Sequence, residues 1–118
     1  MNAKKMNLLL IEKFPQLKTA YDEEVSWQDG DETGAHVVYG DVFVPFIEET
    51  IQNCKSICEI IDFIESILQM KADYSDEVIY STVLYDLILN DTVIEKDIFP
   101  HLKPLSKKAW NALKKDLL

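Results

Sequence analysis

The oxygen donors clustered in Asp29-Gly30-Asp31-Glu32-Thr33-Gly34 are the residues whose spacing comes nearest to a known chemistry. This segment is similar to the first half of a calcium-binding loop, which has oxygen ligands at its first, third and fifth positions and glycine at its sixth. The second half departs from the pattern, because Gly40 stands where the bidentate glutamate belongs. We therefore expect a solvated acidic turn and no metal site. A cation-binding or small-molecule site in residues 29–41 is the alternative.

His36 is the second candidate, because it is followed by the carboxylates Asp41, Glu48 and Glu49. An imidazole titrates near neutral pH and a carboxylate can orient it, so such a group suits acid–base catalysis. An enzymatic site would combine His36 and Asp41 with Asp29 and Asp31. No nucleophile with a matching motif accompanies them, and we expect His36 to pack and hydrogen-bond where the loop joins a helix. We assign no catalytic residue and no cofactor, and we expect that the protein is not an enzyme.

Negative charge is concentrated in one part of the chain. Between Lys18 and Lys55 the sequence contains neither Lys nor Arg, and the formal net charge of the protein is -9. The same stretch contains these carboxylates: Asp22, Glu23, Glu24, Asp29, Asp31, Glu32, Asp41, Glu48 and Glu49. Such a surface attracts cations, whereas phosphate binding needs clustered Lys and Arg. We therefore expect a basic protein as the partner, and neither nucleic acid nor a membrane.

Two aromatic residues near these carboxylates, Trp27 and Tyr39, are our candidate anchors for a partner, because buried aromatic side chains dominate many protein interfaces. The flanking acidic residues contribute steering more than affinity. The predicted partner-binding set is Glu23, Glu24, Trp27, Asp29, Asp31, Glu32, His36 and Tyr39.

The compartment is inferred from the N-terminus, where the apolar run from Leu8 to Ile11 is too short for a signal-peptide core and is followed by charge. We expect a cytoplasmic protein. Cys54 and Cys58 are the two cysteines, too few for a disulfide framework or a four-ligand zinc site. Both are expected to be small buried hydrophobic residues.

Glycine and proline are few, so most of the chain can be helical. We predict one all-α domain over residues 1–118, a compact antiparallel bundle of about six helices with one long acidic loop at 28–40. Successive helix pairs could stack in a HEAT-like manner. The best-defined helix has an apolar stripe from Ile57 to Leu68, with Glu59, Asp62 and Glu65 expected to face water. Residues 78–89 are apolar almost all round, which is typical of a helix in the centre of a core.

Helix starts are predicted from capping residues. Asp41 is expected to cap a helix that buries Phe43 and Phe46, and Ser106 is expected to cap the last helix. One alternative is a β-hairpin, because residues 36–44 contain two β-branched runs around Gly40-Asp41. Pro45 argues against the hairpin, since proline cannot donate a hydrogen bond to a strand ladder.

Three strings resemble a family of short, acidic, uncharacterised bacterial proteins: Gly34-Ala35-His36-Val37-Val38-Tyr39-Gly40-Asp41-Val42-Phe43-Val44-Pro45-Phe46-Ile47-Glu48, Ile61-Asp62-Phe63-Ile64-Glu65 and Thr82-Val83-Leu84-Tyr85-Asp86. In that family a loop ending in a His-Val-aromatic-Gly-Asp pattern leads into a helix that opens with an aromatic residue and proline. Its members are similar to immunity proteins encoded beside secreted polymorphic toxins. The resemblance implies an all-α protein without an assigned activity, and it supplies no catalytic residues. It leads to the hypothesis of an immunity-type inhibitor whose acidic surface binds a basic toxin.

Overall fold

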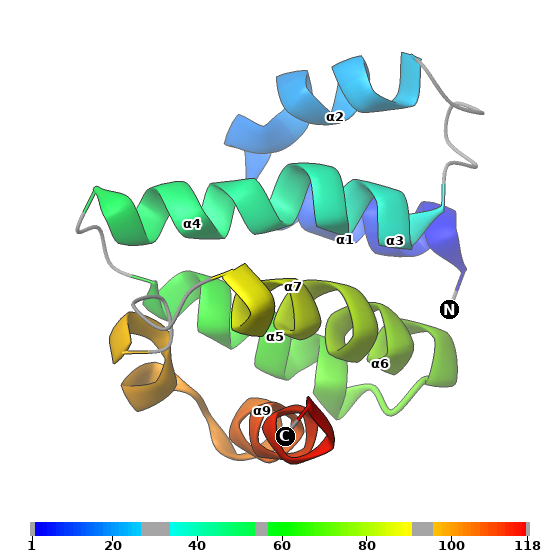
Figure 1. Ribbon diagram of the computed structural model, residues 1–118. Coiled ribbons are helices and arrows are strands. Elements are labelled where there is room, and N and C mark those ends of the chain that lie inside the picture. Colours follow the sequence, from blue (N-terminus) through cyan, green and yellow to red (C-terminus); the bar gives the residue numbers. More distant parts are fainter. Residues whose placement is uncertain (1, 27–33, 54–56, 91–95, 118) are drawn as a thin grey trace.

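The computed structural model describes residues 2–26, 34–53, 57–90 and 96–117. Within these ranges the chain forms helices and no strand (Figure 1), so the predicted all-α class is confirmed and the hairpin alternative for residues 36–44 is wrong. The main helices are α1 (Ala3–Lys13), α2 (Lys18–Ser26), α3 (Ala35–Val38), α4 (Val44–Gln52), α5 (Cys58–Gln69), α6 (Asp73–Val78), α7 (Tyr85–Asn90) and α9 (Pro104–Leu117). None of the described helices is long and apolar enough to cross a lipid bilayer.

Short α-helices merge into two long ones through π-helical turns. The π-helical segment η3 (Tyr39–Phe43) joins α3 to α4, and η4 (Ile79–Leu84) joins α6 to α7. We call the results the 35–52 helix and the 73–90 helix. The predicted loop at 28–40 is therefore wrong for residues 35–40, and Asp41 lies inside a helix instead of capping one.

Pro45 provides a physical reason for the first π-helical turn. Proline inside an α-helix lacks the N–H donor, and its ring clashes with the carbonyl four residues earlier. Directly before Pro45, the N–H of Val44 donates to the carbonyl of Tyr39, five residues back, which makes a wider turn. The wider turn lets the helix continue through Pro45, where the sequence predicted a helix start.

The helices form layers around one core. Figure 1 shows the 35–52 helix between α2 on one side and α5 with the 73–90 helix on the other. Beyond α5 and the 73–90 helix lies α9, which contacts α5 and η4. The first helix, α1, contacts α3 at the start of the 35–52 helix. The two π-helical segments, η3 and η4, also contact each other. The layers therefore bring residues near 40 and residues near 82 together.

Aromatic rings fill the centre of the N-terminal half. The ring of Phe63 on α5 lies 5.5 Å from Phe14 and 5.6 Å from Phe43 between centroids, both in edge-to-face geometry. Tyr39 packs edge-on against Phe43 at 5.6 Å. These geometries favour aromatic pairs beyond simple burial. The predicted apolar stripe of α5 is also confirmed, because Ile57, Ile60, Ile61, Ile64 and Ile67 are buried.

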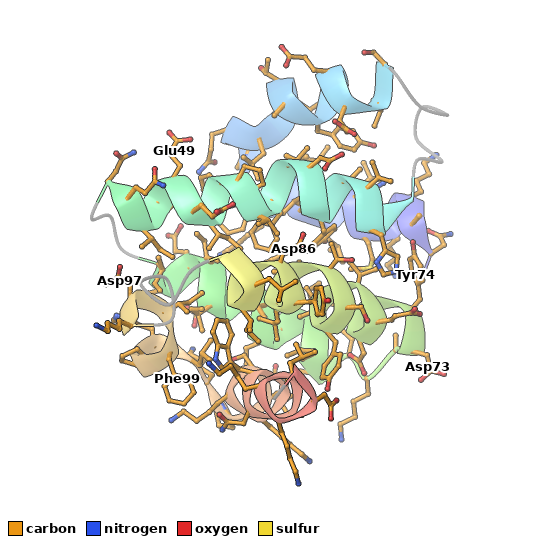
Figure 2. The ribbon with its side chains drawn as sticks, in the orientation of Figure 1. Glu49, Asp73, Tyr74, Asp86, Asp97 and Phe99 are labelled. Atoms are coloured by element: carbon orange, nitrogen blue, oxygen red, sulfur yellow. The ribbon has the colours of Figure 1, made fainter. Side chains whose placement is uncertain are left out.

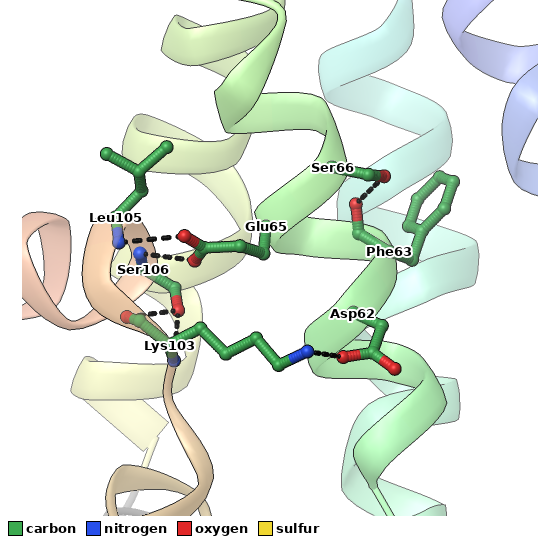
Figure 3. Close-up of polar contacts among 7 residues, drawn as sticks. All are labelled: Asp62, Phe63, Glu65, Ser66, Lys103, Leu105 and Ser106. Atoms are coloured by element: carbon green, nitrogen blue, oxygen red, sulfur yellow. Dashed lines mark hydrogen bonds and ion pairs between the residues drawn. The ribbon is translucent and has the colours of Figure 1, made fainter.

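The N-terminus of α9 is capped from another helix (Figure 3). The carboxylate of Glu65 on α5 accepts hydrogen bonds from the backbone N–H groups of Leu105 and Ser106, both at 2.9 Å. Glu65 is only 5 % exposed, so its predicted water-facing position is wrong. Ser106 is not the cap that the sequence predicted, because α9 begins at Pro104. Cys58 is exposed instead of buried, and Cys54 lies outside the described residues.

Candidate interaction surface

Three carboxylates from three helical segments form two neighbouring pairs, and Asp41 belongs to both pairs. They are Glu24 on α2, Asp41 on η3 and Asp86 on α7, and we call them the acidic cluster. The side chains of Glu24 and Asp41 are close enough to share a hydrogen bond, and the charge of Asp41 also acts on Asp86. Figure 2 shows Asp86 between α7 and the 35–52 helix. The fold thus gathers carboxylates that are far apart in the sequence.

The surroundings of Glu24 and Asp86 raise the pKa values of both carboxyl groups. The hydrogen bond with Asp41, partial burial and the negative charge of Asp41 all raise the pKa of the Glu24 carboxyl. Burial, and then the charge of Asp41, raises the pKa of Asp86. Both shifts mean that the folded protein resists full ionisation of the cluster. A cation bound nearby would relieve this repulsion.

Gly40 makes the close approach of the two long helices possible. A Cβ atom at Gly40 would lie 3.2 Å from Cγ2 of Thr82 and 3.8 Å from Oδ2 of Asp86. The first of these distances is shorter than most contacts of Cβ atoms in proteins, so a larger residue would require Thr82 or η3 to shift by a few tenths of an ångström. Gly40 therefore sets the distance between Asp41 and the helix that carries Asp86.

His36 ties the same two helices together. Its Nδ1 atom lies 2.5 Å from Oγ1 of Thr82, and its ring packs edge-on against Tyr74 at 6.0 Å between centroids. The hydroxyl of Tyr74 in turn accepts a hydrogen bond of 3.1 Å from the N–H of Ala35, the first residue of α3. An imidazole paired with a hydroxyl also occurs in nucleophilic catalysis, but here the pair links one helix to another. His36 thus has the packing and hydrogen-bonding position that we expected.

The predicted partner-binding residues are only partly brought together. Glu23 is exposed on α2, Glu24 belongs to the acidic cluster, and His36 is half-buried against Thr82 and Tyr74. Tyr39 is fully buried, and its hydroxyl donates a hydrogen bond of 2.7 Å to the carbonyl of Met6. Tyr39 is therefore a core residue and does not have the surface position that we assigned to it as an anchor. Four further members of the set, Trp27, Asp29, Asp31 and Glu32, lie outside the described residues.

Sequence patterns missed Thr82 and Asp86. Both lie in a segment that reads as apolar almost all round, and the polar pair at i and i+4 was the available signal. Such a pair marks one face of a helix that must meet something polar. Nothing in the local pattern says that this face meets His36 and Asp41.

The cavities on the described part of the protein surface include two of sizeable volume. One, of about 540 Å³, lies between α2, α4 and the start of α5, and it is lined by Phe14, Phe46 and Glu49 among others. The other, of about 480 Å³, lies between the 73–90 helix and α9, with Asp76 and Lys108 in its wall. Both volumes fall in the range of ligand sites in proteins.

No group of three or more His, Cys, Asp and Glu side chains within the described ranges has the arrangement of a metal site. The acidic cluster is thus not a preformed metal cage. The half calcium motif at 29–34 is mostly outside the described residues, so the alternative of a cation site in residues 29–41 stays a prediction.

Comparison with known proteins gives one match. No curated protein and no solved structure matches the chain. A family model described as "Domain of unknown function (DUF7674)" matches residues 7–117. Because this match spans nearly the whole sequence, the protein belongs to the DUF7674 family.

Proposed function

We propose that this protein is a non-enzymatic interaction module that binds a basic protein. The binding surface is the one that carries the acidic cluster and exposed Glu23, and we call it the acidic face. The observation that carries the proposal is the acidic cluster, in which Asp41 lies near Glu24 of α2 and its charge acts on Asp86 of α7. Holding like charges close lowers the stability of the folded protein at neutral pH. The positive charges of a basic partner offset this destabilisation when the partner binds. This gain on binding is a reason for such an arrangement to exist.

The acidic face also governs how fast a partner arrives. Charges on the exposed side chains of Glu23 and Asp41 add to the field of the chain, which has a net charge of -9. Electrostatic attraction of this kind raises association rates and makes them sensitive to salt. We expect binding that is fast at low ionic strength and slower as salt is added.

The partner class that we propose is a basic toxin made by the same cell, so that the protein acts as an immunity-type inhibitor in the cytoplasm. The support for this step is the resemblance of the 34–48 string and the two downstream strings to proteins of that kind. The charge of the acidic face is consistent with it, because inhibitors of cationic toxins bind in this way.

Co-expression with the product of the neighbouring gene tests the toxin step. If that product is toxic alone and harmless with this protein, the proposal gains its main support. If neither the neighbouring products nor any other basic toxin tested binds the protein, the immunity role is wrong.

Association kinetics test the surface. The variant Glu24→Gln, Asp41→Asn, Asp86→Asn removes the charge of the acidic cluster with little change in shape. The matched control is Glu12→Gln, Glu77→Gln, Asp97→Asn, which removes the same charge from exposed positions elsewhere. The cluster variant should associate about tenfold more slowly and lose most of the salt dependence, whereas the control should change little. If the two variants change the association rate equally, net charge alone governs association, and the assignment of binding to the acidic cluster is wrong.

A further inference from the structure

The larger of these cavities, between α2, α4 and the start of α5, has an apolar floor. Phe14 and Leu17 come from the segment that leads into α2, Ile60 comes from α5, and all three are buried. Phe46 on α4 is only partly buried, and its ring lies 5.3 Å from that of Phe14 between centroids. The cavity therefore offers an aromatic surface that a flat group can stack on.

The charged side chains around this floor that the structure describes have one sign. Among the described residues that line the cavity, the charged side chains are Glu49 on α4 and Glu59 on α5, and both are exposed. Figure 2 shows Glu49 projecting from α4 on the side where α2 lies. Thr50 also lines the cavity, but its hydroxyl already donates to the carbonyl of Phe46. A ligand in this cavity thus meets two carboxylates and an aromatic floor.

We infer that this cavity binds an arginine side chain of a basic protein partner. The inference rests on the proposed function for the source of the arginine. A guanidinium group is planar, so it can stack on Phe46 while its N–H groups donate to Glu49 or Glu59. Its three-carbon stem can cover the apolar floor made by Leu17 and Ile60.

Other occupants fit less well. A purely apolar side chain would fill the floor without using the two carboxylates, and an anionic group would be repelled by them. A lysine ammonium satisfies the charge but is strongly hydrated and does not stack as a flat group. The second cavity lacks this selectivity, because Lys71 and Lys108 line it together with Asp76 and Glu77.

The test is an NMR titration of the full chain with three blocked amino acids: N-acetyl-arginine methylamide, the lysine equivalent and the norleucine equivalent. We expect the arginine probe to shift the backbone amide signals of Leu17, Phe46 and Thr50 and to saturate. The lysine probe should bind more weakly, and norleucine should not saturate. Shifts spread over the whole surface, or equal binding of norleucine, would overturn the inference.

Variants at the rim locate the site. Glu49→Gln with Glu59→Gln should weaken binding of the arginine probe about tenfold, since hydrogen bonds to charged groups contribute about that much. The control, Glu12→Gln with Glu77→Gln, removes equal charge from exposed positions outside this cavity and should leave binding unchanged. Unchanged binding in the rim variant would contradict the inference. The probes need no partner protein, so this test is independent of the proposed function. The arginine site can be disproved while binding of a basic protein to the acidic cluster is confirmed, and the proposed function can be disproved while the arginine site is confirmed.

Discussion

Glu65 on α5 and Ser106 on α9 are joined through a hydrogen bond of 2.9 Å from the Ser106 backbone N–H to the Glu65 carboxylate. The remaining donors in this first turn also have partners. Pro104 has no N–H, Leu105 donates to Glu65, and the N–H of Lys103 donates to the Ser106 hydroxyl. The arrangement is a capping box in which the side chain that normally comes from the N-cap residue is supplied by a different helix. Glu65 thus stabilises α9 and fixes it against α5 at the same time.

Replacing Glu65 should destabilise the fold. Glu65→Ala removes the acceptor of one buried and one half-buried N–H group, and we expect the free energy of unfolding to fall by about 1–3 kcal/mol. Chemical denaturation followed by circular dichroism measures this change. Glu59→Ala, an exposed carboxylate on the same helix, is the control and should change stability by less than about 0.5 kcal/mol. Equal losses for the two variants would mean that the cap contributes nothing special.

The role of Glu65 shows where local patterns reach their limit. Periodicity correctly placed the apolar stripe of α5, because residues three and four apart share a helix face. Glu59, Asp62 and Glu65 follow at intervals of three and look equivalent in the sequence. They differ only in what packs over them: Asp62 forms an exposed ion pair with Lys103, while α9 covers Glu65. That difference depends on a residue about forty positions away.

Gly40 and Thr82 should be coupled. Alanine in a helix is more favourable than glycine by about 1 kcal/mol, yet a Cβ at Gly40 would lie 3.2 Å from Cγ2 of Thr82. Thr82 has little freedom to move, because its hydroxyl is bonded to His36. We expect Gly40→Ala to lower the free energy of unfolding by about 1 kcal/mol, since overpacking outweighs the gain in helix propensity.

A double-mutant cycle with Thr82→Ser checks the cause. Serine keeps the hydroxyl and removes the methyl group that the new Cβ would meet. In the Thr82→Ser background, Gly40→Ala should therefore be neutral or stabilising, by up to about 1 kcal/mol. The same loss in both backgrounds would show that the contact with Thr82 is not what requires glycine at this position.

The region around Gly40 was also the hardest to predict from the sequence. Val37, Val38, Val42 and Val44 favour extended structure, and Gly40-Asp41 favours a turn, so loop and hairpin were both reasonable expectations. In the folded chain Val38, Val42 and Val44 are buried against neighbouring helices. Packing of this kind overrides weak local preferences. Pro45 is compatible both with a helix start and with the π-helical turn before it, so the sequence alone does not distinguish the two.

The acidic cluster should make stability depend on pH. The pKa values of Glu24 and Asp86 are raised in the folded state, so between the ordinary and the raised values the folded protein holds more protons than the unfolded chain. The contribution of these groups to stability is therefore greatest below their unfolded pKa. It falls as pH rises through the raised values, and it stays low at neutral pH.

Neutralising either group should reverse this loss. Glu24→Gln and Asp86→Asn are each expected to raise the free energy of unfolding at neutral pH and to flatten its pH dependence in the weakly acidic range. Denaturation curves collected across that range for both variants and for Glu12→Gln provide the comparison. If the cluster variants show the same pH profile as the unmodified chain, the surroundings of Glu24 and Asp86 do not disfavour their ionised forms.

Substitution of Tyr39 distinguishes a role of its side chain in the core from a role in binding a partner. Burial raises the pKa of its hydroxyl, which donates to the Met6 carbonyl, so Tyr39→Phe should cost about 1 kcal/mol of stability by removing that hydrogen bond. Ile64→Ala, at an equally buried position that makes no polar contact through its side chain, should cost about 2–5 kcal/mol through a cavity. Neither change should alter the association rate with a basic partner at temperatures where the protein is folded. If Tyr39→Phe slows association while stability is unchanged, the ring is reached by the partner and its assignment to the core is wrong.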